Sequence, residues 1–431
     1  MKIQPAKSLR GTLNLPGDKS ISHRAAMFGG IAEGITRVNG FADSQDCQST
    51  LDCLSMLGVE VKRENDTLLV SGPQGGLKKP ARILDVGNSG TTARMLSGIL
   101  AGQPFMSELT GDESIQRRPM QRIIDPLTQM GAKIESNQGR VPLKISGGDL
   151  KPITYRLPVA SAQVKSCILL AGLLADGWTT VIESVPTRNH TELMLKTFGA
   201  NLSVESVGEE QHIKVSGKAA LHSQEIFVPG DVSSAAFFIC AALMVPNSEI
   251  ILKNIGLNPT RTGLIDFLIQ NGAAIEILEK RNLNNEMVGD LRVRHSRLIA
   301  QTGEGFRIGS PLIANLMDEI PILAILATQS DSDFLICDAT ELRHKETDRI
   351  ATIVEGLRAM GAKVDELPDG LIIPGKQTLT GALINSHGDH RIAMAFAIAA
   401  LVADGPTEII GAASAAVSFP EFFNCLNRLV K

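Results

Sequence analysis

The feature that most constrains the fold is an internal repeat. Five segments share one pattern, in which an amphipathic helix ends at a glycine and is followed by a strand, a turn and a second strand. These segments are residues 56–61, 129–134, 197–202, 270–275 and 359–364. Glycine suits the left-handed position that closes a helix. The spacing is about 70 to 90 residues, longer than solenoid repeats, so the pattern predicts a few large α/β units.

A second, more apolar helix is expected before each amphipathic helix, and its first residues are always polar. The six polar starts are residues 19–20, 88–91, 161–163, 231–234, 318–319 and 389–391. The runs that follow, such as 93–101 and 235–244, are hydrophobic on nearly every side, so these helices are predicted to be buried. A short strand follows each run, as at 178–183 and 407–410. Each unit is therefore buried helix, strand, amphipathic helix and hairpin.

The sixth copy predicts a domain that is discontinuous in sequence. Its amphipathic helix is expected at 420–430, and no hairpin follows. Residues 1–15 are typical of strand, turn and strand, with the turn at 9–12, so we expect them to supply the missing strands. One domain would comprise residues 1–16 and 229–431, and the other residues 17–228, with three units in each. Pro-Gly pairs mark both crossings, so a hinge is expected near 15–17 and 228–230.

Composition excludes several classes of protein. The net charge of -4 argues against a nucleic-acid-binding chain. No apolar run is long enough to cross a membrane, and no apolar leader segment is present, so the expected location is the cytoplasm. The six cysteines are scattered without a CxxC pair, so neither a zinc site nor a disulfide framework is expected.

The polar helix starts indicate anion binding. Free N–H groups at a helix N-terminus attract phosphate and carboxylate groups. Lys19 and Arg24 add positive charge to the first start, where Asp18 or Ser20 is expected to cap the helix. The alternative is an ordinary capped helix with a solvated charged face. If the buried helices of each domain are parallel, their starts point the same way, which predicts small anionic ligands in a cleft between the domains.

Three further segments carry residue types that bind anions. Residues 85–94 are glycine-rich but lack the Walker and Rossmann patterns. The loop 111–120 contains Arg117 and Arg118, which are expected to clamp a carboxylate or phosphate. Residues 188–192 begin an amphipathic helix. The corresponding alternatives are a glycine-rich turn, a solvated loop and a simple helix start.

The second half of the chain adds candidates for acid–base chemistry. Residues 341–349 are the densest charged run, and on a helix Lys345 and Arg349 would share a face, with a solvated helix face as the alternative. Of Asp318 and Glu319, one is expected to cap a buried helix and the other to act as general base. The histidines of 387–391 lack further ligands at useful spacing, so this start is interpreted as an anion site rather than a metal site.

Together, the motifs at 16–24, 161–166, 188–192 and 258–261 resemble the 5-enolpyruvylshikimate-3-phosphate synthase family, in particular its class II branch, which is associated with tolerance of glyphosate. The resemblance covers the whole length. It implies an α/β fold, a two-domain inverse α/β barrel of the enolpyruvyl-transferase type with six βαβαββ-type repeats, three per domain. It also implies an active site in the interdomain cleft, no metal or organic cofactor, no nucleic-acid or membrane partner, glyphosate as an inhibitor, and a cytoplasmic monomer.

The resemblance implies transfer of the enolpyruvyl group of phosphoenolpyruvate to the 5-hydroxyl of shikimate 3-phosphate. Phosphate leaves through a tetrahedral intermediate, in the shikimate pathway to chorismate and aromatic amino acids. Shikimate 3-phosphate would be bound by Lys19, Ser20, Arg24, Ser161, Ala162, Gln163, Arg188, Asp318 and Lys345. Phosphoenolpyruvate would be bound by Lys19, Asn88, Gly90, Arg118, Gln163, Arg349, His390 and Arg391. Asp318 would be the base, and Glu346 or Lys19 the proton donor to C3.

Two positions depart from patterns in the family. Val417 stands where class I members have a lysine, and Gly90 stands where some tolerant class II members have alanine, which weakens the expectation of tolerance. One alternative is the UDP-N-acetylglucosamine enolpyruvyl transferase, which typically has a reactive cysteine in the loop that here holds Arg118. A non-catalytic anion-binding homologue is the other alternative, and the presence of Asp318 and Lys345 argues against it.

Overall fold

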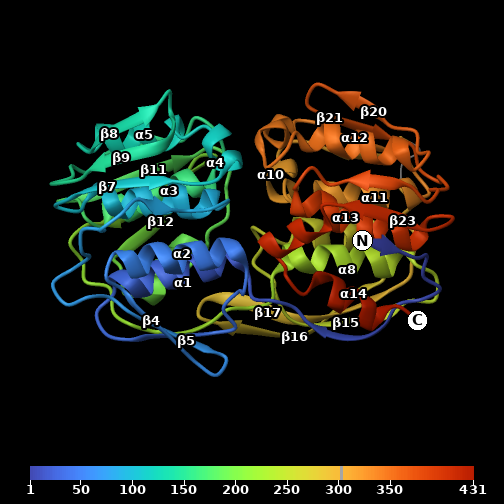
Figure 1. Ribbon diagram of the computed structural model, residues 1–431, viewed down its shortest axis with the longest axis horizontal. Coiled ribbons are helices and arrows are strands. Elements are labelled where there is room, and N and C mark those ends of the chain that lie inside the picture. Colours follow the sequence, from blue (N-terminus) through green and yellow to red (C-terminus); the bar gives the residue numbers. More distant parts are fainter. Residues whose placement is uncertain (301–303) are drawn as a thin grey trace. The chain divides into compact units, whose positions relative to one another are not determined.

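The computed structural model describes residues 1–300 and 304–431, which divide into two compact units (Figure 1). Unit 1 comprises residues 1–16, 229–282 and 287–431, and unit 2 comprises residues 17–228 and 283–286. The chain therefore passes from one unit to the other near residues 16–17 and 228–229. The tip of one hairpin, residues 283–286, is also grouped with unit 2. The hinge expected at the two crossings stays a prediction.

Unit 2 consists of three repeats, each with a four-stranded sheet. Its strands are β3 (Thr36–Asn39), β4 (Glu60–Glu64), β5 (Thr67–Ser71), β6 (Leu84–Asp85), β7 (Met106–Thr110), β8 (Lys133–Asn137), β9 (Arg140–Ser146), β10 (Thr154–Arg156), β11 (Trp178–Glu183), β12 (Leu202–Val207), β13 (Glu210–Ser216) and β14 (Glu225–Phe227). Its helices are α1 (Lys19–Ile31), α2 (Gln45–Met56), α3 (Gly90–Ala101), α4 (Glu113–Arg117), α5 (Gln121–Gln129), α6 (Ala162–Gly172) and α7 (His190–Thr197). The strand orders are β14-β3-β5-β4, β6-β7-β9-β8 and β10-β11-β13-β12.

Unit 1 repeats this plan. Its strands are β1 (Lys2–Ile3), β2 (Arg10–Asn14), β15 (Glu249–Gly256), β16 (Ile275–Leu283), β17 (Glu286–Arg294), β18 (Phe306–Ile308), β19 (Phe334–Ile336), β20 (Asp365–Leu367), β21 (Gly370–Ile373), β22 (Leu383–Asn385) and β23 (Thr407–Ile410). Its helices are α8 (Val232–Met244), α9 (Gly263–Gln270), α10 (Ile313–Leu316), α11 (Ile320–Gln329), η1 (Thr340–His344), α12 (Arg349–Ala359), α13 (His390–Ala399), η2 (Ala400–Val402), η3 (Ala412–Val417) and α14 (Phe422–Leu429). The strand orders are β16-β17-β15-β2, β18-β19-β21-β20 and β1-β23-β22.

Buried helices form the centre of each unit. In unit 2, α3 contacts both α1 and α6, and in unit 1, α8, α11 and α13 contact one another. Every residue of α8 is buried, as its continuous apolar sequence predicts. The apolar residues form two separate cores, and each core lies within one unit.

Local sequence signals determine where the helices begin and end. The side chains of Asp18, Ser89, Ser161, Asp231 and Asp389 each accept a hydrogen bond from a backbone N–H in the first turn of the helix that follows. Of the two candidates at the first start, Asp18 is therefore the cap. The repeat glycines at 58, 131, 199, 272 and 361 have φ between +78° and +108°, which confirms the predicted left-handed helix ends.

The start of α11 departs from the expectation of a carboxylate cap. Glu319 occupies the N-cap position but makes no capping hydrogen bond. Its Oε1 instead accepts a hydrogen bond from the Ser233 hydroxyl of α8. Arg261 donates to the same hydroxyl at 2.7 Å, so Glu319 belongs to a polar link between neighbouring elements of unit 1.

The two N-terminal strands do not both complete the sixth repeat, which corrects that prediction. β1 does so, because it pairs antiparallel with β23. β2 pairs in parallel with β15 of the fourth repeat, and it begins at Arg10, where a turn was expected. β14 in turn pairs in parallel with β3. Each strand that precedes a crossing thus stays in the unit that the chain is leaving, a long-range arrangement without a local sequence signal.

The first crossing depends on a glycine. A Cβ atom on Gly17 would lie 1.9 Å from the carbonyl oxygen of Gly40, so no other residue fits without moving the backbone. Just before it, the carbonyl oxygen of Pro16 accepts a hydrogen bond from the Asp231 N–H at 2.9 Å. The segments that enter α1 and α8 are therefore bonded to each other.

Within the described residues, no helix combines the length and apolar character that a membrane span requires.

Candidate functional site

The predicted site residues fall into two groups at the helix starts. The unit 2 cluster contains Lys19, Ser20, Arg24, Asn88, Gly90, Arg118, Ser161, Ala162, Gln163 and Arg188. The unit 1 cluster contains Asp318, Lys345, Glu346, Arg349, His390 and Arg391.

In the unit 2 cluster, Arg24 joins α1 to α6 and α7. Its Nε donates to Thr191 Oγ1 at 2.7 Å, its Nη2 to Ser166 Oγ at 2.9 Å and its Nη1 to the Ser20 carbonyl oxygen at 2.8 Å. Burial lowers the pKa of Arg24 to about 10, although Glu192 acts in the opposite direction. Among the described residues, the hydrogen bonds of this buried cation go to neutral acceptors, and its nearest negative charges, such as Glu192, act on it without a hydrogen bond.

A chain of polar side chains joins α1, α2 and α3. His23 Nδ1 lies 2.7 Å from Thr50 Oγ1, which lies 2.6 Å from Thr92 Oγ1. Burial, followed by the charges of Lys19 and Arg24, lowers the pKa of His23 well below its ordinary value. A neutral imidazole therefore supports the first helix start. Beside it, the Lys19 ammonium is 2.7 Å from Asp46 Oδ2 and is partly exposed.

The starts of α3 and α6 are connected by Gln163. Its Oε1 accepts from Arg94 Nη1 at 2.6 Å, and its Nε2 donates to Thr91 Oγ1 at 3.0 Å. A Cβ atom on Gly90 would lie 2.9 Å from Arg94 Nη1 and 3.1 Å from Arg118 Nη1. Glycine at this position therefore leaves room for two guanidinium groups beside the N-terminus of α3.

The loop after β7 brings one arginine into the cluster rather than two. Arg118 is buried, and its Nη2 donates to Ser114 Oγ at 3.1 Å and to Asn88 Oδ1 at 3.3 Å. Arg117, at the end of α4, is exposed. The predicted clamp by the two arginines together is therefore wrong, because the turn after this short helix directs only Arg118 inward.

In the unit 1 cluster, three cations surround Asp318. Its Oδ1 lies 3.5 Å from Lys345 Nζ and 3.6 Å from Arg349 Nη1, and its Oδ2 lies 4.0 Å from Arg391 Nη2. Arg391 Nη1 also donates to the backbone oxygen of Asp318 at 2.8 Å. Asp318 thus lies just before α11 with both its backbone and its carboxylate held by cations.

Arg349 is the most enclosed of these cations, with 1% of its side chain exposed. Its Nη2 lies 2.6 Å from Glu346 Oε2, and its Nε lies 2.8 Å from Asp389 Oδ2. Burial by itself lowers the pKa of Arg349, but Asp389 and Glu346 raise it above the ordinary value. Nη1 is buried and makes no hydrogen bond with any residue in the described parts of the chain, and it faces Asp318 Oδ1 at 3.6 Å.

The charged run 341–349 is not one helix, which corrects that prediction. Thr340–His344 form a 3-10 turn, Lys345 has an extended backbone, and α12 begins only at Arg349. Asp348 caps α12 by accepting from the Ala351 N–H at 3.1 Å, and this cap separates the run into two elements. Lys345 and Arg349 therefore share no helix face and meet instead at Asp318.

Several residues that support the site were missed from the sequence. Arg94 could have been found, because it lies one helical turn after Gly90 and so shares a face of α3 with it. Asp389 could have been found as a cap next to His390. Asp46 and Thr191 carry no comparable signal, because they reach Lys19 and Arg24 only through the packing of separate helices.

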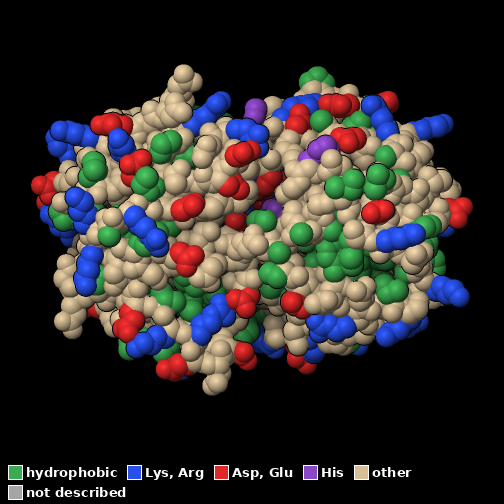
Figure 2. Space-filling model, viewed as in Figure 1, with side chains coloured by type: hydrophobic (Ala, Val, Ile, Leu, Met, Phe, Trp, Pro, Cys, Tyr) green, Lys and Arg blue, Asp and Glu red, His purple; other side chains and the backbone are tan. Residues whose placement is uncertain are grey.

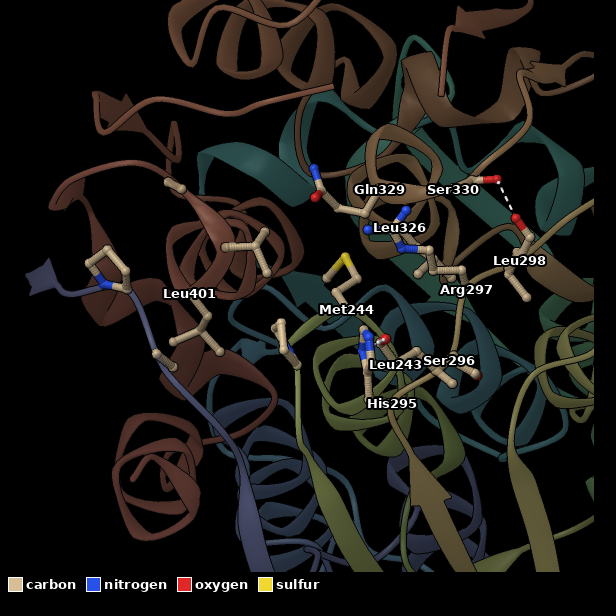
Figure 3. A pocket seen from close by; sticks show the side chains of 15 residues that line it. Leu243, Met244, His295, Ser296, Arg297, Leu298, Leu326, Gln329, Ser330 and Leu401 are labelled. Atoms are coloured by element: carbon tan, nitrogen blue, oxygen red, sulfur yellow. Dashed lines mark hydrogen bonds between the residues drawn. The ribbon is translucent and has the colours of Figure 1, made fainter. Parts of the chain in front are cut away.

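A cavity of about 340 Å³ in unit 1 lies elsewhere (Figure 3). It is lined by the C-terminal ends of α8, α11 and η2, through Leu243, Gln329 and Leu401 among others. None of the predicted site residues lines it, and the unit 1 cluster lies at the opposite ends of α11 and α13.

On the face that Figure 2 shows, basic and acidic side chains are interspersed rather than gathered by sign.

Comparison with known proteins identifies the family. The family model described as EPSP synthase (3-phosphoshikimate 1-carboxyvinyltransferase) matches residues 3–426. The chain belongs to the EPSP synthase family. The 3-phosphoshikimate 1-carboxyvinyltransferase of Solibacter usitatus is 50% identical, over 100% of this chain and 99% of the relative. The one of Geobacillus kaustophilus is 51% identical, over 98% of each.

Solved structures agree with this assignment. An EPSP synthase from Acinetobacter baumannii matches with a TM-score of 0.86 and 42% identity, over 100% of this chain and 98% of that chain. The predicted resemblance, the two-domain α/β fold of six repeats and the enzyme class are thereby confirmed. The matched family is EPSP synthase rather than the UDP-N-acetylglucosamine enolpyruvyl transferase that was the alternative.

Proposed function

We propose that the two clusters carry out enolpyruvyl transfer from phosphoenolpyruvate to the 5-hydroxyl of 3-phosphoshikimate, with named roles for their residues. The observation that carries the proposal is the division of charge between the clusters. In the unit 2 cluster the described hydrogen bonds of Arg24 go to neutral acceptors, whereas the unit 1 cluster places Asp318 among three cations. The first arrangement suits phosphate binding, and the second suits an oriented base beside anionic substrate groups.

Shikimate 3-phosphate is assigned to Lys19, Ser20, Arg24, Ser161, Ala162, Gln163 and Arg188 of unit 2. Free N–H groups at the starts of α1 and α6 and the charge of Arg24 support this assignment. Phosphoenolpyruvate is assigned to Lys19, Asn88, Gly90, Arg118, Gln163, Arg349, His390 and Arg391. The space at Gly90 supports it, as does Arg349 Nη1, which forms an ion pair with Asp318 but no hydrogen bond within the described residues. Lys345 and Asp318 are assigned to the shikimate ring hydroxyls.

Asp318 is the proposed general base. The 5-hydroxyl gives its proton to Asp318 as its oxygen attacks C2 of phosphoenolpyruvate, and C3 takes up a proton to give a tetrahedral intermediate. C3 then loses a proton, the bond from C2 to the phosphate oxygen breaks, and the double bond forms again. The cations around Asp318 and the arginines on phosphoenolpyruvate stabilise the negative charge on these groups.

Glu346 and Lys19 are the two candidates for the proton donor to C3. Glu346 is bonded to Arg349, and Lys19 is bonded to Asp46, so each is held in place by a partner of opposite charge. Glu346→Gln and Lys19→Met are compared at saturating concentrations of both substrates, where loss of the donor removes exchange of solvent hydrogen into C3 and weakened binding alone does not. Deuterium incorporation into the product, followed by mass spectrometry, measures this.

Asp318→Asn tests the assignment of the base. We expect kcat to fall by about 10²- to 10⁴-fold, the usual contribution of general acid–base catalysis, while 3-phosphoshikimate still binds. Phosphate release that depends on 3-phosphoshikimate measures kcat, and calorimetry measures binding. Asp290→Asn, at a carboxylate of unit 1 outside the cluster, is the matched control. Unchanged turnover in Asp318→Asn would remove Asp318 from the base role.

The proposal extends to properties that rest on the sequence motifs. We place the chain in the class II branch, as a cytoplasmic monomer for which glyphosate competes with phosphoenolpyruvate. All six cysteines are free and buried, as is usual in a reducing compartment. Inhibition by micromolar glyphosate, with phosphoenolpyruvate near its KM, would contradict tolerance. Light scattering at working concentration tests the monomer.

A further inference from the structure

A buried ion triad lies behind the unit 2 cluster and has no part in the roles assigned above. Lys165, on α6, is 0% exposed. Its ammonium lies 2.9 Å from Glu183 Oε2 and 2.7 Å from Glu192 Oε1, and it donates to the Thr187 carbonyl oxygen at 3.4 Å. The Lys165 ammonium already has these three protein oxygens as partners, so we treat any role in the reaction as exerted through other residues.

The triad holds one particular loop. Glu183 is the last residue of β11, Glu192 lies in the first turn of α7, and Thr187 lies between them. The hydroxyl of Thr187 also donates to Glu183 Oε1. A single ammonium therefore binds both ends and the middle of the β11–α7 loop, residues 184–189. This loop carries Arg188, whose positive charge contributes to lowering the pKa of Arg24.

The other side of the triad is the start of α6. Ser161 caps this helix, and Gln163 is joined to Arg94 and Thr91 of α3. Lys165 lies in the first turns of the same helix, so its position relative to Ser161 and Gln163 is set by the helix backbone. The next residue, Ser166, and the residue before Glu192, Thr191, both accept hydrogen bonds from Arg24. The triad thus spans two segments that the proposed phosphate site uses.

The charged composition of the triad argues against a role that is limited to stabilising the contact between α6 and the loop. Burying a charge costs several kcal/mol, and apolar side chains of similar volume hold such a junction at least as well. Apolar contacts are non-directional, whereas an ammonium with three oxygen partners defines both distance and direction. We propose that Lys165 is a positioning residue that holds the Arg188 loop at a fixed distance from the start of α6, and so sets the affinity for the phosphate of 3-phosphoshikimate. The inference rests on the proposed 3-phosphoshikimate site.

Lys165→Met tests the inference by the steady-state parameters of each substrate. We expect the KM for 3-phosphoshikimate to rise about 10- to 100-fold, as for loss of one hydrogen bond to a charged group. The KM for phosphoenolpyruvate and kcat at saturation should change less than about threefold, because the other cluster residues stay in place. Lys165→Arg keeps the charge and should recover part of the affinity. An unchanged KM for 3-phosphoshikimate in Lys165→Met would overturn the inference.

A double-mutant cycle with Arg188→Gln separates this inference from the site assignment. If Lys165 acts through Arg188, the double variant should bind 3-phosphoshikimate no more weakly than Arg188→Gln does. Fully additive losses would overturn the inference and leave the site assignment standing. If Arg188→Gln has no effect on 3-phosphoshikimate binding, Arg188 leaves the proposed site and the inference falls with it. Calorimetric titration of each variant with 3-phosphoshikimate gives the four affinities.

Loss of folding is controlled in two ways. Lys165→Met leaves Glu183 and Glu192 as buried, unpaired carboxylates, so the triple variant with Glu183→Gln and Glu192→Gln removes all three charges at nearly constant volume. The triple variant should fold and still show the raised KM for 3-phosphoshikimate. Lys253→Met breaks a 2.6 Å ion pair with Asp290 in unit 1 and should lower the Tm without changing either KM. A normal KM in a folded triple variant would overturn the inference.

Discussion

Arg24 of unit 2 and Arg349 of unit 1 are both buried guanidinium groups at a helix start, but their surroundings are opposite. Arg24 donates to two hydroxyls and a carbonyl oxygen, and burial lowers its pKa to about 10. Arg349 pairs with Glu346 and Asp389, which raise its pKa in spite of burial. Arg349 is thus paired directly with two carboxylates, whereas Arg24 makes no described hydrogen bond to a carboxylate and is influenced by Glu192 only from a distance. In the proposed roles, the unit 2 cluster attracts phosphate, and the unit 1 cluster holds the base Asp318 beside paired cations and carboxylates.

The largest effect is expected for Arg349→Met. Removing this cation leaves Asp389, which is fully buried, and Glu346 without their main partner, so the free energy of unfolding should fall by about 3–5 kcal/mol. Urea denaturation measures the loss. Adding Asp389→Asn should restore part of it, because asparagine can still cap α13. A loss below about 1 kcal/mol would show that the two arginines do not differ in this way.

Arg24→Met should affect ligand affinity more than stability. The hydroxyls of Ser166 and Thr191 already share a hydrogen bond of 2.6 Å, and Ser166 also donates to the Ala162 carbonyl oxygen, so both hydroxyls keep a partner when the guanidinium is removed. We expect the KM for 3-phosphoshikimate to rise about 10- to 100-fold, with less than half the destabilisation of Arg349→Met. Arg24→Lys, which keeps the charge, is the control. The reverse order of stabilities would contradict the comparison.

The burial of His23, together with the charges of Lys19 and Arg24 beside it, should also appear in the pH dependence of stability. An unfolded histidine has a pKa of about 6.5, and burial with Lys19 and Arg24 holds the folded pKa well below that value. Below pH 6.5 the unfolded state therefore binds more protons, so the contribution of His23 is complete above pH 6.5 and is lost as pH falls toward the folded pKa. The slope should approach about 1.4 kcal/mol per pH unit.

His23→Gln removes this titration and is the direct comparison. Urea denaturation of both proteins between pH 7 and 5 should show a shallower decline in the variant. Saturating 3-phosphoshikimate should lessen the decline in the parent protein, because a bound phosphate offsets the nearby positive charge. Parallel pH profiles of parent and variant would argue that the folded imidazole is not kept neutral by its surroundings.

The smallest effect is expected for Gly90→Ala. The new Cβ would lie 2.9 Å from Arg94 Nη1 and 3.1 Å from Arg118 Nη1, so both flexible side-chain ends must shift by a few tenths of an ångström. We expect the KM for phosphoenolpyruvate to rise about fivefold, equivalent to about 1 kcal/mol, with little change for 3-phosphoshikimate. Gly148→Ala, where the added Cβ meets nothing within 4 Å, is the matched control. An equal rise in the KM of both substrates would show that the space at Gly90 is not specific to phosphoenolpyruvate binding.

The parts of the fold that were predicted from sequence depend on local interactions. Caps such as Asp18 and Ser161 act within three residues, and the repeat glycines close their own helices. Continuous apolar runs identified the buried helices for the same reason. The charged run 341–349 misled because charge spacing alone suggested a helix, whereas the Asp348 cap starts a new one. A cap inside a run is therefore a stronger signal than i,i+4 charge spacing.

The parts that were missed depend on distant segments. No local pattern shows that β2 pairs with β15, or that Asp46 reaches Lys19. The same holds for the two glutamates around Lys165, although a lysine inside an apolar helix was itself a visible signal. A cation in a buried position requires an acidic partner, so the sequence predicts that Lys165 has one without showing that it is Glu183 and Glu192.

The pairing of β1 with β23 has a consequence for synthesis on the ribosome. The three sheets of unit 2 are complete once Phe227 has emerged, whereas the first residues of the chain must wait unpaired until residues 407–410 arrive. The Lys431 N–H donates to the Ser8 carbonyl oxygen at 3.1 Å, so the last residue lies against the N-terminal segment within unit 1. A circular permutant that begins at Pro229, with Lys431 joined to Met1, would translate unit 1 without interruption and spare its edge strand that long exposure.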